Sequence, residues 1–143
     1  MVGPVPVRVV KRSFIEERFD ANYYAPILLT QRILAKNRIR PEGSIVFIAS
    51  ISAHTGTRGM SIYSAAKASL VVTAKCLALE VCKHRVRVNC LSPGLVRTPF
   101  FKPDEQEWLN NEAKRYPLGL GEAEDVANAA VFLLAPASRW RPR

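Results

Sequence analysis

The spacing of apolar and polar residues predicts a helix, a strand, a second helix, a second strand and a closing helix, in that order. Apolar side chains recur at roughly helical spacing over residues 14–37, which predicts the first helix. Ser13 followed three positions later by Glu16 is typical of a capping box at its start. Pro26 inside this segment predicts a kink or a new first turn.

Two short, continuous apolar runs, residues 45–49 and 86–91, are typical of strands buried on both faces of a parallel sheet. Residues 61–82 between them are apolar on nearly every side, which predicts a long helix covered all round by the sheet and by another subunit. Alternating helices and strands imply parallel pairing through right-handed crossovers. The pattern therefore predicts an α/β fold.

The ends of the chain are less regular. Residues 1–12 are rich in Pro, Val and Arg, and within them residues 5–10 are expected to form a short edge strand or a disordered arm. Residues 99–117 are expected to be irregular or partly helical, and residues 126–134 to form the last helix. The predicted organisation is an N-terminal arm followed by one domain over residues 13–143.

Composition agrees with one globular domain, since 48% of the 143 residues are hydrophobic and 23% are charged. The net charge of +9 and a pI near 9.9 would suit an anionic partner. The basic residues are scattered, however, and form no block of like charges, so nucleic acid is not the expected partner.

The cysteines and the apolar segments indicate where the protein resides. Three cysteines without a Cys-x-x-Cys pair, together with only two histidines, predict reduced thiols and no metal site. No uninterrupted apolar run approaches the roughly 18 residues of a membrane span. We therefore expect no membrane association and a cytoplasmic location.

One constellation suggests chemistry. Tyr63 and Lys67 lie four residues apart, on one face of the predicted helix, and Ser50 ends the preceding apolar run. Ser50 and the pair Pro93-Gly94 each follow a predicted strand, and ligands of such sheets bind beyond the carboxyl ends of the strands. A free phenol, with a pKa of about 10, is a poor base near neutrality, and a neighbouring ammonium favours its phenolate. A hydroxyl can polarise a carbonyl, so the set suits proton transfer during redox chemistry.

Five segments, in order, resemble motifs of the short-chain dehydrogenase/reductase family. They are Asn22-Tyr-Tyr-Ala-Pro, Gly43-Ser-Ile-Val-Phe-Ile-Ala-Ser50, Tyr63-Ser-Ala-Ala-Lys67, Arg87-Val-Asn-Cys-Leu-Ser-Pro93-Gly94-Leu-Val96-Arg-Thr98-Pro, and Pro117-Leu-Gly-Leu-Gly-Glu-Ala-Glu-Asp125. The likeness covers about residues 14–140 and implies a Rossmann-like parallel sheet with flanking helices.

The resemblance also implies roles. Tyr63 would be the general acid/base, Ser50 would polarise the carbonyl, Lys67 would tune the tyrosine and hold the cofactor ribose, and Asn22 would help position a proton-relay water. The implied catalytic set is Asn22, Ser50, Tyr63 and Lys67, and the implied cofactor-binding set is Tyr63, Lys67, Pro93, Gly94, Val96 and Thr98. The cofactor would be NAD or NADP.

Other parts of the family pattern have no counterpart. No glycine-rich turn follows a strand to hold a cofactor diphosphate, because Gly56 and Gly59 lie in the loop before Tyr63 and Gly119 and Gly121 precede the last helix. We therefore expect a truncated domain of two to three strands. The choice between NAD and NADP, and the substrate, stay open.

Three functions follow from these residues. The first is hydride transfer between a nicotinamide cofactor and a small alcohol or carbonyl substrate. The second is a non-enzymatic remnant that self-associates through the apolar helices 14–37 and 61–82, which would also pair subunits of an enzyme. The third is a basic nucleic-acid-binding protein, which the scattered charges disfavour.

Overall fold

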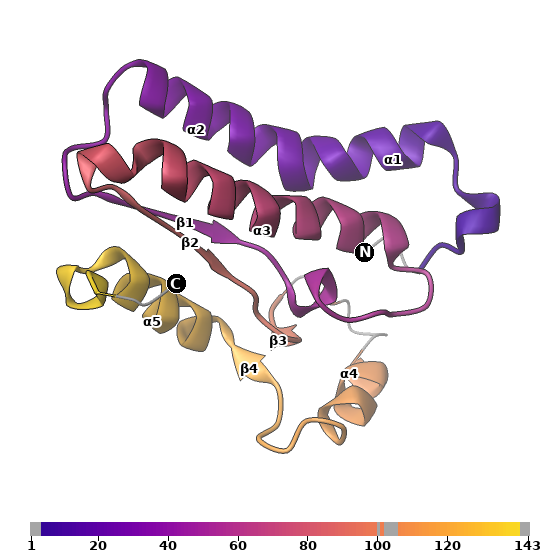
Figure 1. The fold of residues 1–143 in the computed structure, drawn as a ribbon. Coiled ribbons are helices and arrows are strands. Elements are labelled where there is room, and N and C mark those ends of the chain that lie inside the picture. The colour runs from indigo at the N-terminus through magenta and orange to yellow at the C-terminus, as the bar shows by residue number, and fades with distance from the viewer. Residues whose placement is uncertain (1–3, 100, 102–105, 141–143) are drawn as a thin grey trace.

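The computed structural model describes residues 4–99, 101 and 106–140. Its helices and sheet lie in layers (Figure 1). The outermost layer is α1 (Arg12–Phe19), a π-helical segment (Asp20–Tyr24) and α2 (Ala25–Ala35), which run on from one another above α3 (Ser61–Val81). The sheet lies beneath α3, and α5 (Ala123–Leu134) lies on the other face of the sheet (Figure 1).

The main sheet has two parallel strands, β1 (Ser44–Ile48) and β2 (Arg87–Leu91). Ser44 pairs with Arg87, and the register continues to Ile48 opposite Leu91. Because α3 connects the two strands, the predicted parallel crossover is confirmed. A second pair of two-residue strands, β3 (Val96–Arg97) and β4 (Gly121–Glu122), is also parallel and was not predicted.

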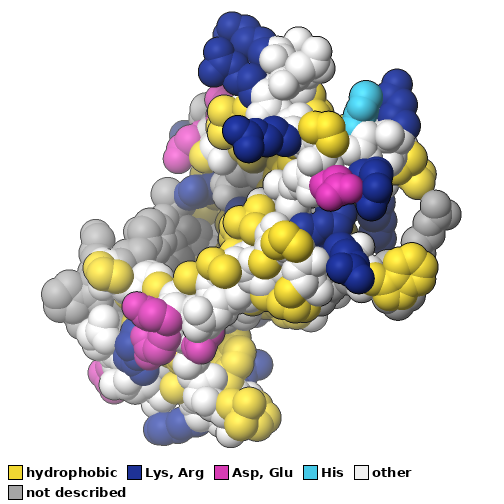
Figure 2. All heavy atoms as spheres, turned by 90° about the vertical axis from the view of Figure 1, so that its left-hand side faces the viewer, with side chains coloured by type: hydrophobic (Ala, Val, Ile, Leu, Met, Phe, Trp, Pro, Cys, Tyr) yellow, Lys and Arg dark blue, Asp and Glu magenta, His cyan; other side chains and the backbone are white. Residues whose placement is uncertain are grey.

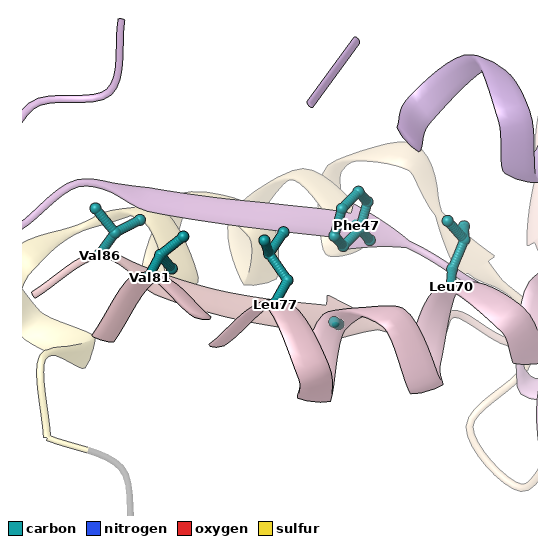
Figure 3. Packing of buried hydrophobic residues seen from close by; sticks show 6 residues of the cluster. Phe47, Leu70, Leu77, Val81 and Val86 are labelled. Carbon is teal, nitrogen blue, oxygen red and sulfur yellow. The ribbon is translucent and has the colours of Figure 1, made fainter. Parts of the chain in front are cut away.

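The core lies between α3 and the sheet. Its side chains point toward one another from both elements in Figure 3, namely Phe47, Leu70, Leu77, Val81 and Val86. On α3 the buried positions recur every three or four residues, so they form one stripe that faces the strands. Leu70 is only 2% exposed, which places the centre of the core about midway along the helix.

Within this single chain, the predicted buried elements are covered only in part, and the predicted cover of α3 by another subunit stays a prediction. On α3, Val72 is 59% exposed and Leu79 is 62% exposed, because the layer of α1 and α2 covers only part of the outer face. On β1, Phe47 is buried, but Ile48 is 44% exposed.

The first helix begins differently from the prediction. Lys11 is its N-cap, with no side-chain hydrogen bond, so the expected capping box of Ser13 and Glu16 does not form. The Glu16 carboxylate instead accepts a 2.7 Å hydrogen bond from the Arg12 guanidinium one turn earlier. Pro26 lies in the first turn of α2, which confirms the predicted new first turn, the second of the two alternatives.

The N-terminal arm forms a 3₁₀ turn at Val7–Val9, so the predicted edge strand is wrong. The Val5 amide donates to the carbonyl of Gly59 at 2.9 Å, which holds the arm on the loop before α3 rather than along a strand. Gly59 has a φ of +78°, and a Cβ there would lie 2.5 Å from the Cβ of Pro4. Only glycine permits this close approach.

The last helix begins earlier than predicted, at Ala123, because Glu122 and Asp125 form a capping box. The Glu122 amide donates to Asp125 Oδ2 at 2.8 Å. The helix ends before Pro136, where a 3₁₀ turn, Pro136–Ser138, follows. Between β3 and β4, α4 (Gln106–Ala113) confirms the expectation of a partly helical segment.

The surface shows how the basic residues are distributed. On the face seen in Figure 2, Lys and Arg side chains lie in several separate places with hydrophobic side chains between them. Cys76, Cys82 and Cys90 are all free thiols. Within the part of the chain that the structure describes, no helix is both long enough and apolar enough to cross a membrane.

Candidate active site

The predicted catalytic residues of α3 and β1 meet where β1 ends. The Lys67 ammonium donates a 2.9 Å hydrogen bond to the carbonyl oxygen of Ile48, the last residue of the strand. Its Nζ lies 5.8 Å from the centre of the Tyr63 ring, one helical turn earlier. Ser50 is two residues beyond Ile48. The sequence spacing thus placed a phenol and an ammonium side by side at the carboxyl end of a parallel strand.

Ser50 has extended backbone and forms the N-cap of a 3₁₀ turn, Ile51–Ala53. Its Oγ accepts a 3.2 Å hydrogen bond from the amide of Ser52, which fixes the side chain. Among the described residues, the Ser50 hydroxyl donates to none. Its proton therefore remains available to an incoming oxygen.

The end of β2 lies beside the same point. The amide of Ala49 donates to the Leu91 carbonyl at 2.7 Å, and the amide of Ile51 donates to the Pro93 carbonyl at 2.8 Å. These bonds flank Ser50 on both sides and hold it next to the Pro93-Gly94 segment. The predicted convergence of the two strand ends is the geometry observed.

A second link joins the two loops. His54 Nε2 lies 3.1 Å from Ser92 Oγ, at hydrogen-bond distance. Sequence reasoning missed this pair, because the residues are 38 positions apart and neither belongs to a recognisable motif. It ties the loop that precedes α3 to the segment that precedes Pro93.

Burial and charge act against each other around Lys67. Partial burial lowers the pKa of Lys67, and electrostatic interaction with Cys90 opposes that shift. Burial raises the pKa of the Cys90 thiol, while Lys67 and the amide of Ala49 act in the other direction. Cys90 was not predicted as a neighbour of the site. Its position on β2, opposite Phe47, follows only from the strand register.

Asn22 lies in the π-helical segment, and its side-chain amide donates to the Arg18 carbonyl at 2.9 Å. Among the described residues, no hydrogen bond joins Asn22 to Ser50, Tyr63 or Lys67. Pro26, four residues after Asn22, has no N–H for the Asn22 carbonyl to accept. Single π-helical turns often occur at functional sites. The sequence predicted a disturbance at Pro26 but not its π-helical form.

Three of the remaining predicted residues line a hollow beyond β2. Its volume is about 320 Å³, and its lining includes Pro93, Gly94, Val96 and Tyr116. Thr98, just past β3, is not part of this lining. In the described part of the chain no hydrogen bond connects these residues to Tyr63 or Lys67. The structure thus brings three of the predicted cofactor residues, Pro93, Gly94 and Val96, together in one hollow.

Comparisons with known proteins identify the family. The sequence model described as enoyl-(acyl carrier protein) reductase matches residues 5–141. A 3-oxoacyl-[acyl-carrier-protein] reductase from Bos taurus is 44% identical over 109 residues, which are 75% of this chain and 45% of that protein. Dehydrogenase/reductase SDR family member 4 from Homo sapiens is 35% identical over 121 residues, 82% of this chain and 44% of that protein. The chain therefore spans less than half the length of these curated relatives.

Solved structures agree. A short-chain dehydrogenase/reductase family oxidoreductase from Burkholderia thailandensis has a TM-score of 0.85 and 34% identity, covering 97% of this chain and 55% of that one. An NADPH-bound short-chain oxidoreductase from Pseudomonas aeruginosa PAO1, described as containing an atypical catalytic center, has a TM-score of 0.85 and 25% identity, covering 96% of this chain and 56% of that one. The fold is a small Rossmann-like α/β arrangement, and the chain belongs to the short-chain dehydrogenase/reductase family.

Proposed function

We propose that this chain carries the active-site part of an oxidoreductase that transfers a hydride between a nicotinamide cofactor and an alcohol or carbonyl substrate, with Tyr63 as the general acid/base. The observation that carries the proposal is the position of Lys67. Its ammonium is bonded to the Ile48 carbonyl at 2.9 Å and lies 5.8 Å from the Tyr63 ring centre. A cation fixed beside a phenol favours the phenolate that proton transfer requires.

The three side chains divide the work. In the reductive direction the carbonyl carbon gains a hydride, and Tyr63 gives its proton to the carbonyl oxygen. Ser50 donates a hydrogen bond to that oxygen as negative charge develops on it. Lys67 stabilises the phenolate left on Tyr63. In the oxidative direction each transfer is reversed, and Tyr63 takes the proton of the alcohol.

The residues present fit the nicotinamide and ribose end of the cofactor, which supplies or accepts the hydride when it is bound. Lys67 uses one N–H on Ile48 and keeps the others for ribose hydroxyls. The Tyr63 hydroxyl forms no hydrogen bond with any described residue. Pro93, Gly94, Val96 and Thr98 would hold the nicotinamide. No described turn of this chain would hold the diphosphate, and both NAD and NADP are included in the proposal.

Asn22 is proposed to hold a water that renews the proton of Tyr63. Its carbonyl has no N–H partner at Pro26, because proline has no amide hydrogen. The π-helical segment that contains Asn22 packs against α3, where Tyr23 and Thr73 place their hydroxyls 3.2 Å apart. A carbonyl without an α-helical partner near the active-site helix is a suitable anchor for such a water.

The activity can be measured by the oxidation of NADH and NADPH, each tested separately, with a panel of small aldehydes and ketones. The proposal predicts carbonyl-dependent consumption of at least one of the two cofactors by this chain. A chain that neither consumes nor binds either cofactor would contradict it. The same panel identifies the substrate class.

A second proposal is self-association through α2 and α3, either in an enzyme or in a non-enzymatic remnant. Large apolar side chains on these helices and at the end of the π-helical segment are exposed by half or more, namely Tyr24, Leu28, Leu29, Val72 and Leu79. A monomer rarely leaves so many such side chains in water on neighbouring helices. A second copy of the chain could cover them.

Replacing Leu29 and Leu79 with lysine is expected to convert a self-associated species into a monomer, because two charges would be buried at the contact. Size-exclusion chromatography with light scattering measures the change. Leu118→Lys is the matched control, since Leu118 is 99% exposed and lies outside these helices. A wild-type chain that is monomeric at all accessible concentrations would refute the proposal.

We also propose that the protein works in a reducing compartment such as the cytoplasm. Its three cysteines are free thiols, and Cys76 and Cys82 are exposed. Exposed thiols are more readily oxidised than buried ones. Fractionation of cells that express the whole protein would test the location.

A further inference from the structure

A second hollow, distinct from the one beyond β2, lies between the N-terminal arm and the loop that leads into α3. Its volume is about 540 Å³, and it is lined by Pro6, Val7, Arg8, Arg58 and Gly59. None of these residues has a part in the proposed proton transfer. Tyr63, however, lies in the first turn of α3, five residues after Arg58, so the hollow adjoins the active-site helix at its amino end.

The hollow is built by a fixed contact of the arm. The amide of Val5 donates to the Gly59 carbonyl at 2.9 Å. Gly59 adopts a φ of +78°, and any Cβ there would lie 2.5 Å from the Cβ of Pro4, so a larger residue would push the arm away. Arg8, on the arm, and Arg58, on the loop, both line the hollow beside this contact.

The charges of the lining are unbalanced. Arg8 and Arg58 are both exposed, and neither guanidinium forms an ion pair or a side-chain hydrogen bond with a described residue. Among the described residues, no carboxylate belongs to the lining, and its two charged side chains carry the same sign. An anion would relieve their repulsion and accept charge-assisted hydrogen bonds from both. Pro6 and Val7 add an apolar wall beside these charges.

We propose that this hollow binds the anionic end of an aliphatic substrate, a carboxylate or a phosphate ester held by Arg8 and Arg58. The apolar wall contacts the neighbouring methylene groups. This inference rests on the proposed function, because the other end of the substrate would carry the carbonyl or alcohol that reacts. The expected substrates are therefore amphipathic anions rather than neutral alcohols.

Binding is tested on the full chain without turnover, by titrating hexanoate, hexyl phosphate and neutral hexanol in amide-resolved NMR. Saturable shifts from either anion, centred on residues 5–9 and Gly59, are expected, whereas hexanol gives much weaker ones. The double variant Arg8→Gln/Arg58→Gln is expected to bind about tenfold more weakly or worse. The control Arg38→Gln/Arg40→Gln removes the same charge in the loop between α2 and β1 and is expected to bind as the wild type does.

Comparing the two anions shows whether the hollow binds phosphate esters or carboxylates. Binding of hexyl phosphate alone assigns phosphate esters, and binding of hexanoate alone assigns carboxylates; either supports the inference. The inference is overturned if hexanol binds as strongly as the anions, or if the control variant loses as much binding as the Arg8/Arg58 variant. It is also overturned if no saturable shifts are seen. Because no reaction is measured, failure here leaves the proposed hydride transfer standing, and failure of that activity leaves an observed anion site standing. The amide spectrum of each variant shows whether it is folded.

Discussion

Replacing Tyr63 with phenylalanine is expected to lower kcat for carbonyl reduction by about 10²–10⁴-fold, the usual contribution of a positioned general acid/base. The phenyl ring keeps the packing on α3 and next to Lys67, but it has no proton to give to the developing alkoxide. Steady-state rates of NADH or NADPH oxidation measure the loss. Because the hydroxyl is one of several contacts proposed for the ribose, cofactor affinity is expected to change far less than kcat.

Tyr24→Phe is the matched control, since it removes a phenolic hydroxyl from a half-exposed residue of the π-helical segment, away from the proposed acid/base position and from the hollow beyond β2. It is expected to retain most of the wild-type kcat. If Tyr63→Phe kept wild-type kcat, another group would have to supply the proton and the proposed mechanism would be wrong. A circular-dichroism spectrum equal to that of the wild type shows that the variant is folded.

Replacing Arg87 with methionine is expected to lower the free energy of unfolding by about 2–4 kcal/mol, because several charge-assisted hydrogen bonds are lost together. The Arg87 guanidinium donates to the carbonyls of Leu133, Leu134 and Ala135 and to Ser138 Oγ, at 2.7 to 3.2 Å. These carbonyls lie at the carboxyl end of α5, where a cation is also favoured by the helix dipole. Urea unfolding followed by circular dichroism measures the change.

Arg139→Met is the control for this result, because Arg139 lies close to the same turn, is exposed and has no side-chain partner among the described residues. It is expected to change the free energy of unfolding by less than about 0.5 kcal/mol. Arg87→Lys is expected to fall between the two, since lysine keeps the charge but cannot present the planar fork of donors. Equal stability of Arg87→Met and Arg139→Met would show that the contact with α5 contributes nothing.

Local geometry explains what the sequence predicted well. Tyr63 and Lys67 meet because residues four apart share a helix face, and this holds wherever the helix is placed. The parallel pairing of β1 and β2 follows from two apolar runs joined by a long helix. The candidate catalytic pair and the strand ends around it were therefore predictable from the order and spacing of residues alone.

Long-range contacts explain what was missed. The strands β3 and β4 are two residues each and exist because Gly121 donates to the Leu95 carbonyl at 3.2 Å, a contact that leaves no periodic pattern. The sequence pattern predicts Arg87 only as part of a strand. Its hydrogen bond to Ser138, 51 residues later, leaves no mark in that pattern. The arm similarly looks like a strand, because its alternating valines give no sign of the contact with Gly59.

The central claim, that Tyr63 and Lys67 hold the nicotinamide and ribose end of a cofactor, is tested most directly by the binding of reduced nicotinamide mononucleotide. This compound lacks the second nucleotide, so its binding does not depend on a turn that holds the complete diphosphate. We expect saturable binding with shifts at Lys67, Val96 and Thr98 in amide-resolved NMR, and a loss of that binding in Lys67→Met. An absence of binding to the folded chain, or binding that Lys67→Met leaves unchanged, would contradict it.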